Sequence, residues 1–311
     1  MRVAITGPNG FIGQNLSNAL KNNSFKVRPL VRSDKHNLID SINIGDISPN
    51  TDWSKALEDV DCIIHCAGLA HNLHKSKSLT LSSYEKINVL GTINLAEQAA
   101  RLGVKRMIFL SSLKVNGDFT KTDSPFTEKD IPKPRGEYAK SKWAAEQRLR
   151  EISSTSKLDV IIVRPPLVYG PGVKANFLSL IKAVSKGLPL PLGSLDNRRS
   201  FISVDNLTDI LIACITKPEA SSKTFLVSDD EDISTSYLIE SMAKLMNKPS
   251  RLFYLPKNLI HLGGFLVDKE SVAKSLIDSL QADISYTKKT LNWEPKSTIQ
   301  EGLKKTIDSF L

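Results

Sequence analysis

The sequence is poor in cysteine and has no long apolar run. Its three cysteines, Cys62, Cys66 and Cys214, are too few for a disulfide framework, and the spacing of the first two fits neither a zinc knuckle nor a redox pair. No apolar run approaches the ~18 residues of a membrane helix. Residues 2–5 lead directly into a glycine turn, without the apolar region of a signal peptide. We therefore expect a protein of the reducing cytoplasm that has no membrane partner.

The chain also lacks a lysine-rich tail and any interleaving of aromatic and basic residues of the kind that RNA-binding surfaces use. Its net charge is +9, and residues 101–150 carry twelve Lys or Arg against six Asp or Glu. Such a basic region suits a small substrate that carries phosphates as well as it suits nucleic acid. We therefore expect no nucleic-acid partner.

Short β-branched runs alternate with helical patterns along the first half of the chain. The pattern predicts strands over residues 3–6, 25–31, 62–65, 106–110 and 159–163, and helices over residues 11–21 and 83–102. Continuous apolar strands separated by helices are typical of a parallel sheet that is covered on both faces. The predicted fold class is therefore α/β, with a doubly wound parallel sheet of the Rossmann type and a smaller C-terminal substrate-binding part.

Three glycines lie between the first predicted strand and the first predicted helix. Gly7 permits a tight turn, Gly10 lets the backbone approach a pyrophosphate, and Gly13 lets the helix pack closely on the strand. The N-terminus of the helix supplies free N–H groups and a positive dipole for the anion. Residues 1–165 are thus predicted to form an NAD(P)-binding domain, and residues 166–311 the substrate-binding part, with some strands returning to the main sheet. The predicted cofactor contacts include the remaining residues of the turn, namely Asn9, Phe11 and Ile12.

The end of the second strand bears on the choice between NAD and NADP. An acidic residue there accepts hydrogen bonds from the ribose hydroxyls of NAD and repels the extra phosphate of NADP. Here the strand ends at Arg32, and no acid occurs before Asp34. Arg32 could hold a phosphate in a bidentate manner or be an ordinary surface arginine, so the sequence favours NADP only slightly over NAD. Further predicted cofactor contacts are Asp46, Ile47, Ala67, Gly68 and Pro165.

Tyr138 and Lys142 are spaced so that they share one face of a helix. A free phenol has a pKa near ~10, too high for a base at neutral pH. An ammonium ~4 Å away contributes about 4 kcal/mol at an effective dielectric of ~20, which would lower the phenol pKa by up to about 3 pH units. Tyr138 is therefore predicted to relay a proton, and both residues are predicted to contact the cofactor.

Ser112 follows the strand predicted over residues 106–110, and strand ends are where α/β folds place ligands. It can hydrogen-bond the substrate oxygen on which Tyr138 acts. Cys62 and His65 lie in an apolar strand and are expected to be core residues. His71 and His74 lie in a polar loop with no third ligand in view, so no metal site is predicted.

With these residues in place, the chain resembles the extended short-chain dehydrogenase/reductase family, and within it the NAD-dependent epimerase/dehydratase group that acts on nucleotide sugars. The resemblance covers nearly the whole chain. It rests on the motifs at residues 6–13, 88–92, 111–112, 138–142, 164–170, 199–207 and 291–295. It implies that Ser112, Tyr138 and Lys142 are the catalytic set, and that the family's homodimer forms through the helices over residues 83–102 and 138–153.

The resemblance also implies a set of substrate contacts. Asn176 and Arg199 would grip the nucleotide diphosphate, and the planar guanidinium of Arg199 suits that group. The segment containing Leu190 would line the base. Lys114 and Ser112 complete the predicted substrate contacts.

The sequence departs from the family's dehydratases directly after Ser112. Those enzymes carry an Asp-Glu or Asp-Lys pair there, whereas this chain has Leu113 and Lys114, and a leucine cannot act as a general acid. The phrases at residues 111–117, 164–172 and 174–177 are similar to a bacterial subgroup from surface-polysaccharide gene clusters. That subgroup includes UDP-glucose 4-epimerases and 4-keto reductases.

The preferred hypothesis is a 4-keto reductase that transfers hydride from NAD(P)H to C4 of a UDP-linked amino- or deoxy-hexose, because no acid follows the second strand and Arg32 suits a cofactor that exchanges. The alternative is a UDP-glucose or UDP-N-acetylglucosamine 4-epimerase with tightly bound NAD. A non-catalytic dinucleotide sensor or RNA-binding scaffold is a more remote alternative, since such proteins usually lose the Tyr-Lys pair.

Overall fold

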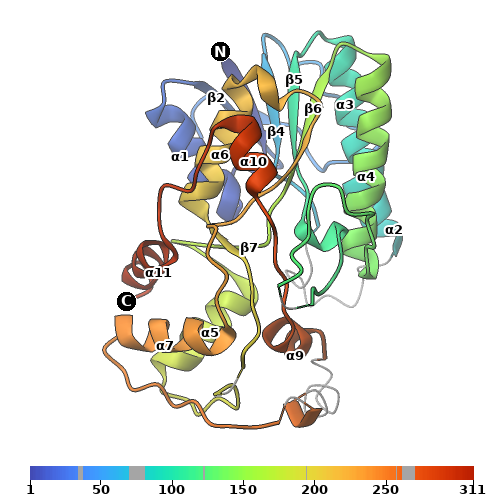
Figure 1. The fold of residues 1–311 in the computed structure, drawn as a ribbon. Helices are drawn as coiled ribbons and strands as arrows, with labels where there is room; N and C mark the ends of the chain where they lie inside the picture. The colour runs from blue at the N-terminus through green and yellow to red at the C-terminus, as the bar shows by residue number, and fades with distance from the viewer. Residues whose placement is uncertain (34–37, 70–80, 122, 194, 257, 261–269) are drawn as a thin grey trace.

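The computed structural model describes residues 1–33, 38–69, 81–121, 123–193, 195–256, 258–260 and 270–311. A parallel sheet with helices on both of its faces occupies the upper half of the molecule in Figure 1, and a smaller group of helices lies below it. No helix in the described part of the chain is long and apolar enough to cross a membrane.

The main sheet has seven strands in the order β3-β2-β1-β4-β5-β6-β9, and every neighbouring pair is parallel. The strands are β1 (Arg2–Thr6), β2 (Lys26–Val31), β3 (Ile42–Asn43), β4 (Cys62–His65), β5 (Arg106–Leu110), β6 (Asp159–Arg164) and β9 (Thr224–Leu226). The order reverses between β1 and β4, and ligands of such sheets bind outside the carboxyl ends of the strands at this point. The structure confirms the predicted doubly wound α/β fold.

Helices cover the two faces of the sheet in separate layers (Figure 1). On one face lie α1 (Phe11–Asn22), α6 (Val204–Thr216) and α10 (Ser285–Leu291), and on the other lie α3 (Gly91–Arg101) and α4 (Gly136–Thr155). Each layer buries its own apolar cluster against the strands, so the sheet is apolar on both faces. The strand β9 and the helices α6 and α10 come from the C-terminal half of the chain and complete this layered unit.

The helix predicted over residues 83–102 is divided into three parts. A short α2 (Leu81–Tyr84) is followed by a π-helical segment, η2 (Glu85–Leu90), and only then by α3. Asn88 lies in the π-helical segment, and its side-chain amide donates to the carbonyl of Leu69 and to the hydroxyl of Ser141. π-Helical segments are frequent at functional sites, and this one brings a buried amide to the carboxyl end of the sheet.

The remaining elements form the lower part of the molecule. They are the two-stranded parallel sheet of β7 (Leu167–Tyr169) and β8 (Phe201–Ser203), the helices α5 (Ala175–Ser185), α7 (Thr235–Leu245), α9 (Glu270–Ile277) and α11 (Ile299–Asp308), and the 3-10 turn η3 (Leu113–Val115). Most of these helices share a separate apolar core. The 3-10 turn η4 (Pro218–Ala220) belongs instead to the layered unit, because Ala220 is buried in the apolar cluster that contains residues of α6 and α10. The division of the chain into domains at residue 165 stays a prediction.

Candidate active site

The glycine turn connects β1 to α1 with very little free space around its backbone. Gly7 has a φ of +69°, and its carbonyl accepts a 3.0 Å hydrogen bond from the amide of Gly10. A Cβ on Gly13 would lie 2.1 Å from the Gly7 oxygen, so no other residue fits there. The helix begins directly after this turn with no acidic residue in its first turn. This cradle fits the pyrophosphate of a dinucleotide, whose charge the helix N-terminus favours.

A cavity of about 180 Å³ lies between the glycine turn and the helix α4, and we call it the glycine-turn cavity. It brings together five predicted cofactor contacts from four elements or their ends: Ile12, Gly68, Tyr138, Lys142 and Pro165. Cys66, which the sequence placed in no site, lines it as well. The sequence could have indicated Cys66, because it directly follows β4 and so lies at the carboxyl end of the sheet, as the other residues do.

Four other predicted cofactor contacts lie outside the lining of this cavity, three of them at or beside the glycine turn. Asn9 is exposed, and Phe11 packs against the core of the lower part of the molecule. Ala67 lies against Gly7, because a Cβ added to Gly7 would lie 3.2 Å from the amide nitrogen of Ala67. Ile47 packs under α3, because a Cβ on Gly91 would lie 2.6 Å from it.

Arg32 and Asp46 form an ion pair with an Nε–Oδ1 distance of 3.6 Å at the end of β2, and both side chains are mostly exposed. The sequence analysis gave both residues as cofactor contacts and considered only Arg32 as a phosphate ligand. The structure instead places a carboxylate beside the guanidinium on which the slight preference for NADP depended. A phosphate bound by Arg32 would be repelled by Asp46.

Tyr138 lies in the first turn of α4 and is half-buried. A hydrogen bond with the Ser112 side chain favours its ionised form, but burial and the nearby Tyr84 outweigh it and raise the pKa of Tyr138 to about 12. The lowering of this pKa that the sequence predicted is therefore not found. Burial of the phenol opposes its ionisation more strongly than its neighbours favour it.

Lys142, the other member of the pair, is bonded to the end of a strand. Its Nζ is buried and donates a 2.9 Å hydrogen bond to the carbonyl of Leu110, at the end of β5. The ammonium also lies 4.5 Å from the centre of the Phe109 ring, a cation–π contact. Burial lowers the pKa of Lys142 to about 8, although Cys66 and Glu146 act in the opposite direction. The ammonium is thus bonded to the carboxyl end of β5. Keeping it charged costs free energy because it is buried.

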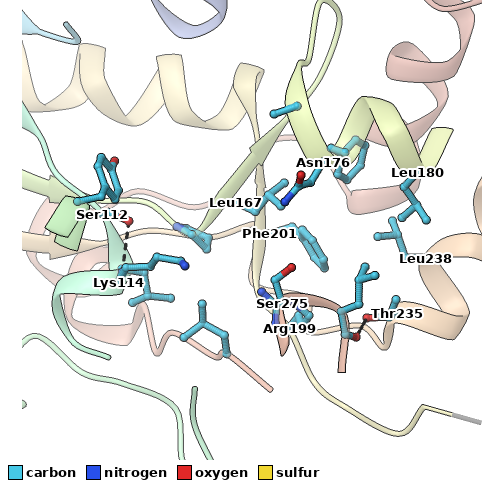
Figure 2. Close-up of a pocket in the computed structure, with 17 residues that line it drawn as sticks. Ser112, Lys114, Leu167, Asn176, Leu180, Arg199, Phe201, Thr235, Leu238 and Ser275 are labelled. Atoms are coloured by element: carbon cyan, nitrogen blue, oxygen red, sulfur yellow. Dashed lines mark hydrogen bonds between the residues drawn. The ribbon is translucent and has the colours of Figure 1, made fainter. Parts of the chain in front are cut away.

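A second cavity of about 330 Å³ lies between the carboxyl end of β5 and the lower part of the molecule, and we call it the large cavity. Figure 2 shows its lining side chains pointing inward from η3, α5, β8, α7 and α9. It contains four of the five predicted substrate contacts: Ser112, Lys114, Asn176 and Arg199. Leu190 is the exception. It is absent from this lining and packs instead beside Leu252, with which it forms an isolated β-bridge.

Arg199 is held rigidly in the wall of the large cavity. It is only 7% exposed, and its Nη1 donates a 2.6 Å hydrogen bond to the carbonyl of Asp278. Burial lowers the pKa of Arg199 to about 10, which leaves it charged at neutral pH. A fixed planar guanidinium of this kind suits a phosphate or diphosphate group.

A buried network behind the serine pair was missed by the sequence reasoning. Glu146 accepts a 2.5 Å hydrogen bond from the hydroxyl of Ser111 and two hydrogen bonds from Arg164, at 2.9 and 2.5 Å. Arg164 also donates to the side-chain oxygen of Asn116, just after η3. Glu146 follows Lys142 by one helical turn, so it lies on the same face of α4. That spacing could have indicated its position.

His65 is a core residue, as expected. It is 1% exposed, and its ring nitrogens are hydrogen-bonded to the hydroxyls of Thr6 and Thr92. Cys62 is equally buried in the same strand. His71 and His74 lie outside the described residues, and within those residues no group of three His, Cys, Asp or Glu could hold a metal ion.

Comparison with known proteins identifies the family to which the chain belongs. The family model described as "NAD dependent epimerase/dehydratase family" matches residues 3–228. A UDP-glucose 4-epimerase of Vibrio cholerae is 42% identical over 315 residues, which cover 99% of this chain and 95% of that protein. An undecaprenol-linked N-acetylglucosamine 4-epimerase of Escherichia coli O157:H7 is 27% identical and covers 86% of this chain and 78% of that protein.

Solved structures show the same fold. The complex of MoeE5 with UDP-glucose and NAD matches with a TM-score of 0.81 at 24% identity, over 100% of this chain and 98% of that one. The UDP-glucuronic acid 4-epimerase of Bacillus cereus, in complex with NAD, matches with a TM-score of 0.80 at 22% identity, over 99% and 98%. With its glycine turn, its Tyr138–Lys142 pair and a family match over residues 3–228, the chain belongs to the NAD-dependent epimerase/dehydratase family of enzymes.

Proposed function

We propose that this enzyme is a nucleotide-sugar 4-epimerase that uses bound NAD. One observation carries the proposal: the glycine-turn cavity and the large cavity share Ser112, Tyr138 and Pro166 in their linings. A dinucleotide in the first cavity and a sugar in the second would therefore meet at the hydroxyls of Ser112 and Tyr138. NAD, when bound, supplies the acceptor and then the donor of hydride.

The lining of the large cavity limits the proton chemistry that is possible there. Among the described residues that line it, Lys114, Tyr138 and Arg199 are the only titratable ones. Elimination of water from a sugar needs a general acid for the leaving hydroxyl, and no carboxylic acid, histidine or cysteine is present in this lining. The lining is therefore suited to proton transfer by Tyr138 at a carbinol oxygen. Such a transfer must accompany hydride transfer at C4.

The residues have distinct roles in this proposal. Ser112 hydrogen-bonds the C4 oxygen, and Tyr138 takes the proton from that oxygen and later returns it. Lys142 supplies a positive charge at the same sheet edge, which favours the ionised form of a phenol in its vicinity. Arg199 holds the diphosphate, with Asn176 beside it.

Three observations favour an epimerase over the reductase that the sequence analysis preferred. The Vibrio cholerae relative at 42% identity is a UDP-glucose 4-epimerase. The Arg32–Asp46 pair disfavours binding of NADPH, the reductant that a reductase would have to exchange at each turnover. Apolar side chains make up most of the large cavity's wall, so few hydrogen bonds would prevent a keto sugar from presenting its other face.

The experiment compares the purified protein with its Tyr138→Phe variant. We expect the wild type to release NAD on acid treatment and to interconvert UDP-glucose and UDP-galactose, or their N-acetylamino counterparts, without added nucleotide. Tyr138→Phe should lower kcat about 10²- to 10⁴-fold, the range that general acid–base groups contribute, while NAD is still released. Unchanged turnover in Tyr138→Phe would contradict the assigned role and revive a non-catalytic reading.

A 4-keto reductase is the second candidate, because the exposed Arg32 follows β2 directly. A GDP-6-deoxy-D-mannose reductase of Pseudomonas aeruginosa is among the relatives, at 24% identity over 99% of this chain. Stoichiometric consumption of NADPH with a UDP-4-keto-6-deoxy-hexosamine, without interconversion of the 4-epimers, would establish this function and overturn the epimerase.

A homodimer is part of the same proposal. The helices α3 and α4 lie side by side on the outer face of the sheet (Figure 1), and Leu90 and Leu102, at the two ends of α3, are 41% and 48% exposed. A pair of such faces from two chains would form a four-helix bundle. Light scattering coupled to size exclusion would show twice the mass of the 34.3 kDa chain.

A further inference from the structure

The charged residues in the lining of the large cavity all have the same sign. Lys114 and Arg199 are cationic, and no Asp or Glu occurs among the described residues that line the cavity. A nucleotide sugar brings its diphosphate charge to such a cavity. Arg199, with its rigid guanidinium, fits that group, which leaves the charge of Lys114 to be explained.

Lys114 is tied to the reacting end of the cavity. Ser112 caps the 3-10 turn η3, and its hydroxyl accepts a 3.2 Å hydrogen bond from the backbone amide of Lys114. Figure 2 shows the Lys114 side chain extending from this turn into the cavity, in the direction of Ser275 and Arg199. Lys114 therefore lies beside Ser112 in the lining of the cavity, on η3, a different part of the wall than the one that carries Arg199.

The ammonium of Lys114 is also free to exchange partners. It lies 3.8 Å from an oxygen of Asp118, and the two side chains are 43% and 37% exposed. Ion pairs with this exposure and distance contribute little to stability. A lysine carries a compact charge on a flexible stem, so a ligand carboxylate could replace Asp118 at small cost.

We infer, on the basis of the function proposed above, that Lys114 selects a sugar with a carboxylate at C6, that is, a nucleotide-linked uronate. C6 is joined to C5, the direct neighbour of the C4 carbon that Ser112 and Tyr138 address. A carboxylate there would lie near η3, and it would give the ammonium of Lys114 a partner in the substrate that a neutral hexose lacks. The other possible role of Lys114, a second grip on the diphosphate, predicts no preference between sugars.

The test uses UDP-glucuronate and UDP-glucose, which differ only at C6, with the wild type and the Lys114→Met variant. Conversion of each to its 4-epimer is followed by NMR, and kcat/KM is determined for each sugar. We expect the wild type to prefer the uronate at least tenfold, and Lys114→Met to lower the ratio of the two kcat/KM values 10- to 100-fold, as expected for a lost charge-assisted hydrogen bond of about 1.5–3 kcal/mol. Inactive protein cancels in this ratio.

Asp118→Asn provides the matched control, because it removes the competing carboxylate and leaves Lys114 in place. The ratio should stay the same or rise. A wild type that turns over UDP-glucose without preferring the uronate overturns this inference and leaves the epimerase proposal intact. Equal losses for both sugars in Lys114→Met also overturn it and assign Lys114 to the diphosphate. No turnover of any 4-epimer pair overturns the proposed function, and this inference with it.

Discussion

The Nζ of Lys142 donates a 2.9 Å hydrogen bond to the carbonyl oxygen of Leu110 and so joins helix α4 to the end of strand β5. The contact holds a charged group in a place where burial lowers its pKa to about 8. The nearby Tyr138 has its pKa raised to about 12. These two residues therefore titrate in the reverse of the usual order of lysine and tyrosine.

This order predicts the pH dependence of the first half-reaction, in which Tyr138 must act as a base. The fraction of phenolate rises tenfold per pH unit below a pKa of about 12. Above a pH of about 8, the fraction of charged Lys142 falls by the same factor. We therefore expect kcat/KM to rise with pH up to about 8 and then to level off. In Lys142→Met the rate should be lower and the break near pH 8 should be absent. A break that persists in this variant would assign the titration to another group.

The Arg32–Asp46 pair predicts the cofactor preference. Asp46 lies 3.6 Å from Arg32 and would repel the additional phosphate of NADP. Asp46→Asn should therefore raise the affinity for NADP relative to NAD by about three- to tenfold, as expected for one exposed charge about 4 Å away. Arg32→Met should lower the same ratio. Binding constants of the cofactor-free protein, titrated with each dinucleotide, provide the measurement. An unchanged ratio in both variants would show that neither Arg32 nor Asp46 reaches the ribose that carries the additional phosphate of NADP.

The parts of the site that the sequence predicted are local in the chain. The glycine turn depends on three glycines within seven residues, and the shared face of Tyr138 and Lys142 depends on helical spacing alone. Both follow from backbone geometry that needs no tertiary information. The strands β1, β4 and β5 were predictable for a related reason, because buried parallel strands are continuously apolar.

The parts that the sequence did not predict depend on long-range contacts. Arg32 and Asp46 are fourteen residues apart in the sequence, and the hydrophobic pattern between them does not predict that their side chains meet. The orientation of Lys142 toward Leu110 depends on how far α4 lies from the sheet. The position of Leu190 outside the lining of the large cavity depends on its pairing with Leu252. The π-helical turn at Asn88 was missed because its apolar pattern differs little from that of an α-helix.

Glu146 is predicted to be a main determinant of stability near the site. It is completely buried and accepts hydrogen bonds from Ser111, Arg164 and Arg150. In Glu146→Gln the guanidinium of Arg164, which is 2% exposed, would lose its counter-charge. Breaking a buried pair by removing one partner costs about 3–5 kcal/mol. The free energy of unfolding, measured by urea titration, should fall by that amount.

Glu151 provides the control for this prediction, since it lies on the same helix and pairs with Arg148 at 2.5 Å while both side chains are exposed. Glu151→Gln should lower the free energy of unfolding by less than about 1 kcal/mol. Similar losses for Glu146→Gln and Glu151→Gln would mean that water or a rearranged Asn116 compensates Arg164, and that the network does not stabilise the serine strand end.

Burial lowers the pKa of His65 to about 3, with a further contribution from the charge of Lys142. In the unfolded chain its pKa is near 6.5. Between these two values the unfolded chain binds a proton that the folded protein does not, so the contribution of His65 to stability is lost as the pH falls through this window. For one group, the free energy of unfolding should fall by about 2 kcal/mol between pH 6.5 and 4.5. Carboxylates add to this slope, and they do so equally in a His65→Asn variant.

The contribution of His65 is therefore measured by how steeply the free energy of unfolding falls with pH in the wild type and in His65→Asn. His65→Asn loses hydrogen bonds to Thr6 and Thr92 and should be less stable than the wild type at pH 7. Its free energy of unfolding should nevertheless decline less steeply with acid, so that the difference between the two proteins narrows by about 2 kcal/mol from pH 6.5 to 4.5. Urea titrations at both pH values measure this difference. If it stays constant, the histidine takes up its proton in the folded protein, and the β4 strand end is open to water instead of being a dry part of the core.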